Sequence, residues 1–342
     1  MRAPRGLHLD YVSLAEYQAA GWADVLGVAT FNGSPALTGE DGSTGIPIAQ
    51  VRTPLLTPAG EMYEVWRCDE PTASGQHHEV RFRRSGDMLF GCIALPEDRG
   101  NGHSPLHEVT TRAYRQIYAT LDAEHCPHLL RVWNYLPDIN RSSHGSERYR
   151  QFNRARRSAL RTSGRPVTGN VPAASALGAA PESPLLVYFL AARTAPAFIE
   201  NPRQVSAYHY PRRYGAHPPV FSRATLLRQC GGLALFISGT ASIVGHRSLH
   251  IGDIAAQTRE TLANIEALLG EANRTAPGAR FSLRELACKV YVRRPADLPI
   301  IQAELYAALG AGVRAIYVQA DICRQDLLVE IEGAAMWPPA ST

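Results

Sequence analysis

The chain has 342 residues, of which 45% are hydrophobic, and its net charge of +4 comes from 35 basic and 31 acidic residues. This length is enough for a large hydrophobic core in one to three domains, and the mild charge argues against a nucleic-acid partner. Because no run of 18 apolar residues and no signal-peptide hydrophobic region occur, we expect a cytoplasmic protein without a membrane span.

The first half of the chain predicts short strands followed by helices. Residues 25–31 form an apolar strand that ends at Asn32-Gly33, and a polar turn follows over 39–45. Segments 78–83 and 87–95 predict a hairpin closed by Ser85-Gly86. The further predicted elements of this half are a helix over 106–123 with an apolar stripe, a strand over 129–136 and an arginine-rich helix over 146–162.

Residues 163–184 are rich in Gly, Ala, Ser and Pro, which is typical of a long loop or a domain boundary. We therefore predict an N-terminal α+β domain over 1–180 and a C-terminal domain over 181–342.

The second half predicts strands and helices in alternation. An amphipathic helix begins after Asp253, a capping residue, and Gly270 is a candidate end for it. Residues 286–293 alternate between apolar and polar side chains, which predicts a half-buried strand. The remaining predicted elements are strands over 185–193, 232–243, 314–320 and 325–332, a loop over 196–222 and a helix over 296–309. This order predicts an α+β sandwich with helices on one face of a sheet. Residues 87–162 alternate in a similar way, so an internal duplication is possible.

The common cofactor and metal motifs are missing from the sequence. It contains no GxGxxG, no GxxxxGK[ST] and no GxSxG. His77 and His78 are adjacent on a predicted strand and would point to opposite faces, so surface or structural roles are favoured over a metal site, also for His125 and His128. The six cysteines form no CxxC pair and are expected to be buried thiols rather than disulfides: Cys68, Cys92, Cys126, Cys230, Cys288 and Cys323.

Glu330 is the strongest single candidate for catalysis. In the strand 327–332 the odd positions are apolar and should face the core, so Glu330 and Glu332 share the opposite face. The pattern alone favours a solvated surface for that face. If the face is enclosed, desolvation would raise the pKa of the carboxyl group and make it a general acid.

Two groups of arginines can be interpreted in two ways. Arg212 and Arg213 lie beside Tyr208, Tyr210 and Tyr214, and a second group lies in the predicted helix. The helix group consists of Arg148, Arg150, Arg154, Arg156, Arg157 and Arg161. They form either a solvated basic surface or a site in which guanidinium groups bind carboxylates.

The turn over 238–242 has a small residue at every position. This composition is typical either of a β-bulge with close strand packing or of backbone and hydroxyl donors that line a ligand site.

Several of these segments, taken in order, resemble the chorismatase family. The matching stretches are VWNYLPDIN (132–140), ERYRQFN (147–153), SAYHYP (206–211), SGTASIVGH (238–246) and LVEIEG (328–333). The C-terminal third is also similar to RidA/YjgF proteins, in IGDIAAQT (251–258), LANI (262–265) and the last strand. The resemblance implies an α+β, RidA/YjgF-like (chorismate-mutase-like) fold that is pseudo-oligomeric within one chain, with an active site that uses both domains.

The resemblance also implies an activity and its residues. Chorismate, a dianion, would be cleaved without a cofactor or metal and would release pyruvate, with Glu330 as the acid that protonates its vinyl ether. Arg156 and Arg213 would hold the substrate carboxylates. Further contacts would come from Tyr149, Tyr208, Tyr210, Thr240, Ala241 and Ser242. One departure from the family pattern is Arg154-Ala155, where relatives often have a small residue and glycine.

Gly239 and Cys323 resemble the family members that form 3-hydroxybenzoate, whereas the hydrolytic type has alanine in place of Gly239. We therefore favour 3-hydroxybenzoate. Formation of 4-hydroxybenzoate in addition, hydrolysis to a dihydroxycyclohexadiene carboxylate, and a RidA-like imine deaminase or metabolite binder stay open as alternatives. A monomer is the expected state.

Overall fold

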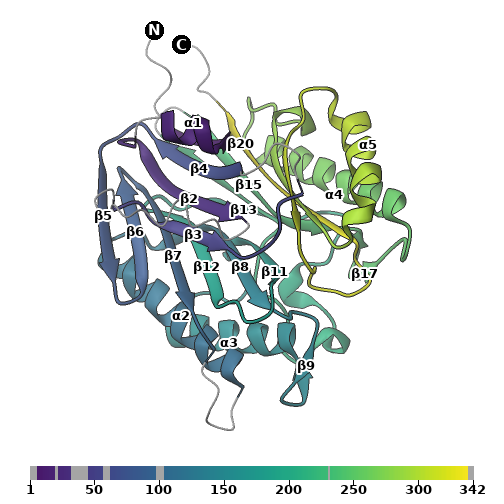
Figure 1. Cartoon of the computed structure of the whole chain (residues 1–342), viewed down its shortest axis with the longest axis horizontal. Coiled ribbons are helices and arrows are strands. Elements are labelled where there is room, and N and C mark those ends of the chain that lie inside the picture. Colours follow the sequence, from purple (N-terminus) through teal and green to yellow (C-terminus); the bar gives the residue numbers. More distant parts are fainter. Residues whose placement is uncertain are drawn as a thin grey trace.

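The computed structural model describes residues 6–19, 22–31, 45–56, 62–97, 104–229 and 232–337. Its strands form three large sheets (Figure 1). The four-stranded sheet has the order β1 (Leu7–Ser13), β4 (Met62–Cys68), β2 (Val25–Phe31), β3 (Ile48–Val51). The second sheet has the order β11 (Ala173–Ala179), β8 (His128–Pro137), β12 (Leu185–Ala192), β7 (Met88–Leu95), β6 (Val80–Ser85), β5 (Thr72–His77). The third has the order β13 (Ala197–Ile199), β14 (Ala224–Gln229), β15 (Gly232–Ala241), β20 (Val329–Trp337), β18 (Ala287–Val292), β19 (Arg314–Gln319).

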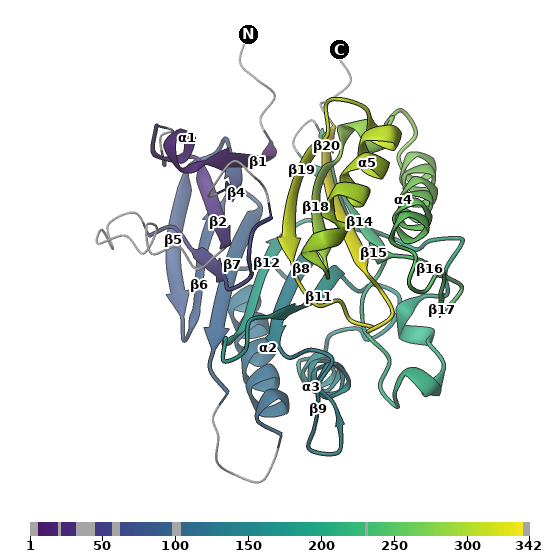
Figure 2. The same cartoon turned by 45° about the vertical axis from the view of Figure 1, so that its right-hand side comes forward.

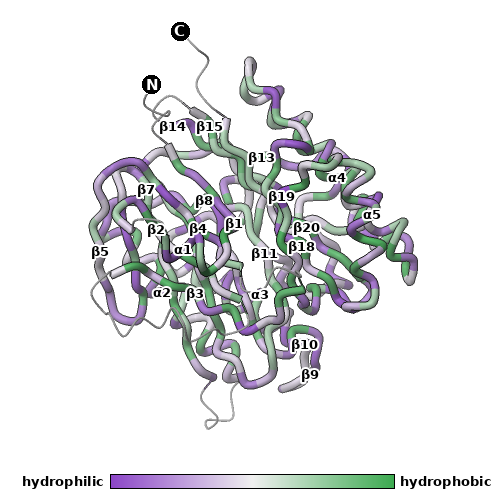
Figure 3. The backbone as a smooth tube through the Cα atoms, turned by 45° about the horizontal axis from the view of Figure 1, so that its top comes forward, coloured by the Kyte–Doolittle hydropathy of each residue, from purple (hydrophilic) through white to green (hydrophobic). Residues whose placement is uncertain are grey.

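One hydrophobic core is shared by all three sheets, and helices cover their outer faces (Figure 2). The helices are α1 (Leu14–Ala19), α2 (Pro105–Ala123), α3 (Arg148–Thr162), α4 (Ile254–Thr275) and α5 (Leu298–Leu309). A separate core lies between α2, α3 and the second sheet, another between α4, α5 and the third, and a small one between α1 and the four-stranded sheet. Figure 3 shows both hydrophobic and hydrophilic residues along the backbone of the sheets. The α+β class, with helices on one face of each sheet, is confirmed.

Most predicted elements are present, and local chemistry explains their bounds. Helix α2 begins after Ser104, whose side chain accepts a hydrogen bond from the amide of His107, and Pro105 occupies the first helical position. Asp253 caps α4 as predicted. The predicted end of that helix at Gly270 is wrong, because the buried face continues through Ala272 and the helix runs to Thr275.

The predicted loop over 163–184 contains strand β11, so that part of the prediction is wrong. Its small residues are buried because β11 pairs in parallel with β8 and packs against β15, where the amide of Ala174 donates to the hydroxyl oxygen of Ser238 at 2.9 Å. Strand β12 lies beyond residue 180 but pairs with β7 and β8 of the second sheet. We therefore propose that the change of domain falls between Ala192 and Ala197.

Strand β18 is buried on both faces, in contrast to the predicted half-buried strand. Lys289, on its polar face, is only 1% exposed. The physical reason is that this face of the third sheet turns toward the core shared with the other sheets. The same arrangement buries Glu330 and Glu332, so the surface position that the strand pattern favoured for them is also wrong.

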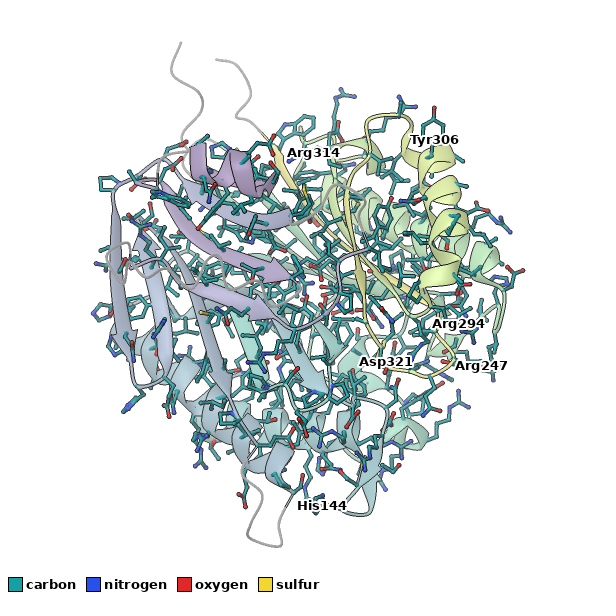
Figure 4. All side chains as sticks on the ribbon, in the orientation of Figure 1. His144, Arg247, Arg294, Tyr306, Arg314 and Asp321 are labelled. Atoms are coloured by element: carbon teal, nitrogen blue, oxygen red, sulfur yellow. The ribbon has the colours of Figure 1, made fainter. Side chains whose placement is uncertain are left out.

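The periphery differs from this interior. Tyr306, on the outer side of α5, exposes 62% of its surface (Figure 4).

The predicted 196–222 loop contains β13 and two short 3-10 helices, η2 (Ala207–His209) and η3 (Arg212–Tyr214). Asn32-Gly33, most of the 39–45 turn and Cys230 lie outside the described residues. Within the described ranges, no helix is long and apolar enough to cross a membrane.

Candidate active site

A pocket lies where helix α3 and strands β8 and β11 meet strands β15 and β20 of the third sheet. Together with its open mouth it contains about 360 Å³ of space between atoms. Its lining consists of Asn134, Tyr149, Phe152, Asn153, Arg156, Ala174, Ser175, Ala176, Pro219, Phe221, Gly239, Cys323 and Glu330. Four of these residues, at 149, 152, 153 and 156, follow the three-four spacing of one helix face, so α3 supplies one wall of the pocket.

Glu330 projects into this pocket from β20. It is paired with Ala241 across the β15–β20 ladder, next to an irregularity of the register between Ile237 and Thr240. The residue is only 4% exposed. Burial, and after it the nearby charge of Glu332, raises the pKa of the Glu330 carboxyl to about 8. Glu330 is therefore largely protonated at neutral pH.

Gly239 lies directly against this carboxyl group. A Cβ atom at Gly239 would lie 1.9 Å from Oε1 of Glu330 and 2.9 Å from Oγ of Ser175. The amide of Gly239 donates to the same Ser175 oxygen at 3.0 Å. The bulge alternative for the 238–242 turn is thus supported at this position, and the missing side chain is what lets the carboxyl group occupy its place.

Arg156 lines the same pocket as Glu330 and is only 3% exposed. Its Nη1 donates to the carbonyl oxygen of Val220 at 2.7 Å, and its guanidinium lies 5.2 Å from the ring centre of Tyr114. Among the described residues, no acceptor has hydrogen-bond geometry for its buried Nε and Nη2 atoms. Buried donors of this kind are costly unless something pairs with them, so they fit an anionic ligand.

The other arginines of α3 divide between the two interpretations. Arg150, Arg154 and Arg161 are exposed and form the solvated basic face, whereas Arg156 points inward. Arg148 is also buried and forms an ion pair with Glu97. Carboxylate recognition is therefore supported for one arginine of this helix rather than for the whole group.

Tyr149 and Cys323 complete the wall beside Glu330. Burial raises the pKa of the Cys323 thiol to about 12, with Glu330 as the next cause, and burial raises the pKa of Tyr149 well above its ordinary value. Both groups are thus neutral, and Cys323 is no candidate for a thiolate nucleophile. The segment that carries Cys323 is held by Arg293, which donates to the carbonyl oxygens of residues 322, 324 and 327 and to Asp321 (labelled in Figure 4).

The remaining predicted site residues do not line the pocket. Arg213 lies exposed on η3, where its Nη2 is 2.7 Å from Nδ1 of His246 and 3.1 Å from the hydroxyl of Tyr214. Tyr210 is buried, and its hydroxyl accepts a hydrogen bond from Arg223 at 2.8 Å. Tyr208 packs against the core of the second sheet.

Thr240, Ala241 and Ser242 are buried behind Gly239. The hydroxyl of Thr240 donates to the carbonyl of Ser238 at 2.9 Å, and that of Ser242 donates to the carbonyl of Leu249 at 3.1 Å. These hydroxyl groups hold the turn together.

Pocket residues that sequence reasoning missed include Asn134, Asn153 and Ser175. Both ends of the Asn134 amide make a hydrogen bond: its Oδ1 accepts from the hydroxyl of Tyr114 at 2.5 Å, and its Nδ2 donates to the carbonyl of Ser175 at 2.9 Å. Asn134 and Asn153 lie inside stretches that resemble the family, which was an available signal. Ser175 lay in the segment interpreted as a loop and gave none.

His77, one of the histidines for which the sequence analysis favoured a surface or structural role over a metal site, has a carboxylate partner. His77 is 3.0 Å from Glu124 and pairs with that carboxylate. Across the described part of the chain, no cluster of three or more His, Cys, Asp or Glu residues could hold a metal ion.

Comparison with known proteins gives consistent relatives. A family model described as "Chorismatase FkbO/Hyg5-like, N-terminal" matches residues 64–191. A 3-hydroxybenzoate synthase from Streptomyces hygroscopicus is 37% identical over 82% of this chain and 84% of its own length. A chorismatase from Streptomyces rapamycinicus is 37% identical over 90% of this chain and 95% of its own. A crystal structure of a chorismatase superimposes with a TM-score of 0.87 at 32% identity, covering 98% of this chain and 100% of the other. A YjgF-family protein from Neisseria meningitidis aligns with 36% of this chain and 91% of its own at a TM-score of 0.28.

Proposed function

The chain belongs to the chorismatase family, and from this premise we propose that it converts chorismate to 3-hydroxybenzoate and pyruvate. The observation that carries the proposal is a buried carboxyl group with a pKa of about 8, Glu330, which shares a pocket with a buried guanidinium, Arg156, whose Nε and Nη2 lack protein acceptors. An acid that is neutral at pH 7 and a cation for an anionic substrate are the two requirements of this reaction.

Glu330 is the proton donor of the first step. Its proton passes to the terminal methylene of the enolpyruvyl group, and the electron pair of the vinyl double bond forms the new C–H bond. The resulting oxocarbenium ion carries a positive charge, which the Glu330 carboxylate left behind stabilises. Because the pocket buries the carboxyl group, this attraction acts in a medium of low dielectric constant.

Arg156 holds one substrate carboxylate through its free Nε and Nη2 donors, and Tyr149 adds a hydroxyl group and ring packing at the same wall. Arg213, the other predicted carboxylate ligand, would first have to leave His246 and Tyr214. We therefore assign the principal carboxylate contact to Arg156.

The second step releases pyruvate. The substrate's own ring hydroxyl attacks the neighbouring ring carbon that bears the ether oxygen, the ether C–O bond breaks, and pyruvate leaves with that bond's electron pair. The hydroxyl oxygen then bridges the two ring carbons; its original C–O bond opens, and loss of one proton to the Glu330 carboxylate gives the aromatic product. The proton that Glu330 donated is thereby restored, and no water is consumed. Gly239 and Cys323, which both contact the space beside Glu330, shape the pocket around the ring. Their match to relatives that form 3-hydroxybenzoate supports this product over the diene diol and over a mixture with 4-hydroxybenzoate.

The decisive experiment compares wild type with Glu330→Gln. The amide preserves the shape of the side chain but cannot donate an acidic proton, so the variant should fold and bind chorismate but release no pyruvate in a lactate-dehydrogenase-coupled assay. Circular dichroism and calorimetric binding serve as controls. Near-normal pyruvate release would remove Glu330 from the acid role. HPLC of the wild-type digest identifies the aromatic product, and an imine deaminase would produce no pyruvate from chorismate.

We further propose that the chain works as a monomer, because both sheets that build the pocket come from one chain. Light scattering across an enzyme dilution series, with unchanged specific activity, is the expected result.

A further inference from the structure

Two carboxylates lie on the same face of β20, two residues apart, and both are buried. Glu330 and Glu332 are each 4% exposed. Along a strand, side chains separated by two residues project in the same direction about 7 Å apart. Two acids this close in a buried site do not ionise equally, and their surroundings decide which one keeps a proton.

Within the described ranges, two cations form ion pairs with these carboxylates, and both pair with Glu332. Arg131 Nη2 donates to its Oε2 at 2.5 Å, and Lys289 Nζ lies 3.2 Å from its Oε1. Neutral donors add to these ion pairs: Trp133 Nε1 at 2.5 Å, Ser175 Oγ at 2.8 Å and Tyr291 Oη at 3.0 Å. Although burial alone would raise the pKa of Glu332, Lys289 and Arg131 lower it below its ordinary value. Glu332 is thus the ionised member of the pair.

Lys289 extends the network away from the pocket. It forms an ion pair with Glu64, and its Nζ donates to the hydroxyl of Tyr188 at 2.7 Å. The network therefore joins two cations, Arg131 and Lys289, with two carboxylates, Glu64 and Glu332. Its charges balance without Glu330, which takes part in no ion pair within the ranges that the structure describes.

Ser175 separates the network from the pocket. Its hydroxyl donates to Glu332 and accepts hydrogen bonds from Arg131 and from the amide of Gly239. The single proton of this hydroxyl is therefore committed to Glu332. Although Ser175 lies beside Glu330, it has no hydrogen bond to offer that would stabilise an ionised Glu330.

We propose that Glu332, held ionised by Arg131 and Lys289, is the positioning residue that keeps the catalytic proton on Glu330. The proposal rests on the acid role of Glu330 proposed above. The negative charge of Glu332 repels an ionised Glu330, while Arg131, Lys289 and Ser175 form their ion pairs and hydrogen bonds with Glu332 and not with Glu330. Other groups surround Glu330 as well: Arg131, Arg293 and Arg223 favour its ionised form. Arg156 lines the same pocket, and Tyr149 and Cys323 stay neutral beside Glu330.

The test replaces Glu332 with its neutral isostere. Glu332→Gln should move the alkaline limb of the kcat/KM profile to lower pH by about one to two units, the effect of a unit charge about 7 Å away at an effective dielectric constant of about 20. At the acid plateau, where Glu330 is protonated in both proteins, kcat/KM should stay within about threefold of wild type.

Glu64→Gln is the matched control. It removes the same charge from the same network, but on the far side of Lys289. Because the Coulomb energy falls with distance, it should move the limb by clearly less than Glu332→Gln does. A limb that stays in place in Glu332→Gln, or moves equally in Glu64→Gln, would overturn the proposal.

Infrared spectroscopy tests the proton directly and needs no turnover. Wild type at pH 6.5 should show the C=O band of a buried protonated carboxyl that disappears in Glu330→Gln and persists in Glu332→Gln at low pH. A band that survives in Glu330→Gln and is lost in Glu332→Gln would show that Glu332, not Glu330, carries the proton, and would refute the inference. This measurement holds even if Glu332→Gln folds poorly, because wild type and Glu330→Gln alone show whether Glu330 carries the proton. A correct band together with near-normal turnover in Glu330→Gln would instead sink the proposed acid role.

Discussion

Replacing Gly239 with alanine tests the geometry of the pocket most directly. The added Cβ would lie 1.9 Å from Oε1 and 2.7 Å from Cδ of Glu330, whereas ordinary contacts need about 3.5 Å. The Glu330 carboxyl group must therefore move by about 1.5 Å. It cannot move toward Ser175, which the same Cβ would approach to 2.9 Å.

A displacement of this size has a predictable cost. Misplacing a reacting group by about 1 Å reduces turnover by about 100-fold, so Gly239→Ala should lower kcat for 3-hydroxybenzoate formation by at least that factor. Combined with Cys323→Ala, which makes room beside the displaced acid for water, it should shift the product toward the diene diol.

The assay is HPLC of the products beside coupled pyruvate detection. Gly270→Ala is a matched control, because no atom lies within 4 Å of the added Cβ on the exposed side of α4. That change should leave kcat unchanged and raise the free energy of unfolding by about 0.5–1 kcal/mol. An unchanged rate and product ratio in the Gly239→Ala, Cys323→Ala double variant would refute the idea that this glycine sets the place of the carboxyl group.

Three further outcomes follow from the same site. Because the active form of Glu330 is protonated and its pKa is about 8, kcat/KM of the wild type should fall about tenfold per unit above that pH; a flat profile to pH 9.5 would contradict the acid role. Arg156→Lys should lower kcat/KM by about 10- to 100-fold through the lost charged hydrogen bonds, whereas Arg213→Ala should cost less than about threefold. If steady-state kinetics show a larger loss of kcat/KM in Arg213→Ala than in Arg156→Lys, the carboxylate is bound at η3 instead. The raised pKa of Glu330 also means that the folded state holds its proton more tightly than the unfolded state, so stability falls as pH rises between about 4.5 and 8. Urea unfolding should show about 3 kcal/mol more loss from pH 5 to 8 in wild type than in Glu330→Gln, and parallel pH profiles would argue against a protonated Glu330.

The sequence was sufficient to predict the helices and strands that depend on local sequence patterns. The helix over 106–123 follows directly from its apolar stripe, and the strand over 129–136 and the arginine-rich helix over 146–162 are also present close to their predicted bounds. Strand β11 was not predictable in the same way. Its Ala, Ser and Gly residues are small because β8 and β15 approach closely from either side, and in the sequence such residues look like a flexible segment.

The burial of Glu330 could not be predicted from the strand pattern, for a different reason. Strand alternation correctly placed Glu330 and Glu332 on one face. It does not show, however, whether this polar face is exposed to water or is buried against another sheet. The partners that decide the matter, Arg131 and Lys289, are distant in sequence. Of the residues that the resemblance to the family pointed to, Glu330 and Arg156 line the pocket, whereas Arg213 and the tyrosines at 208 and 210 do not.

The three sheets around one core also have an evolutionary consequence. In a symmetric assembly of identical subunits, each substitution is repeated at every junction, so a catalytic pocket and a solid, stabilising contact must be built from the same residues. Here each sheet has its own stretch of sequence. Residues at the junction that carries the pocket can change without altering the junctions that hold the molecule together. Directed evolution of product choice in this protein can therefore be confined to α3, β11, β15 and β20, while stabilising changes are sought in the four-stranded sheet.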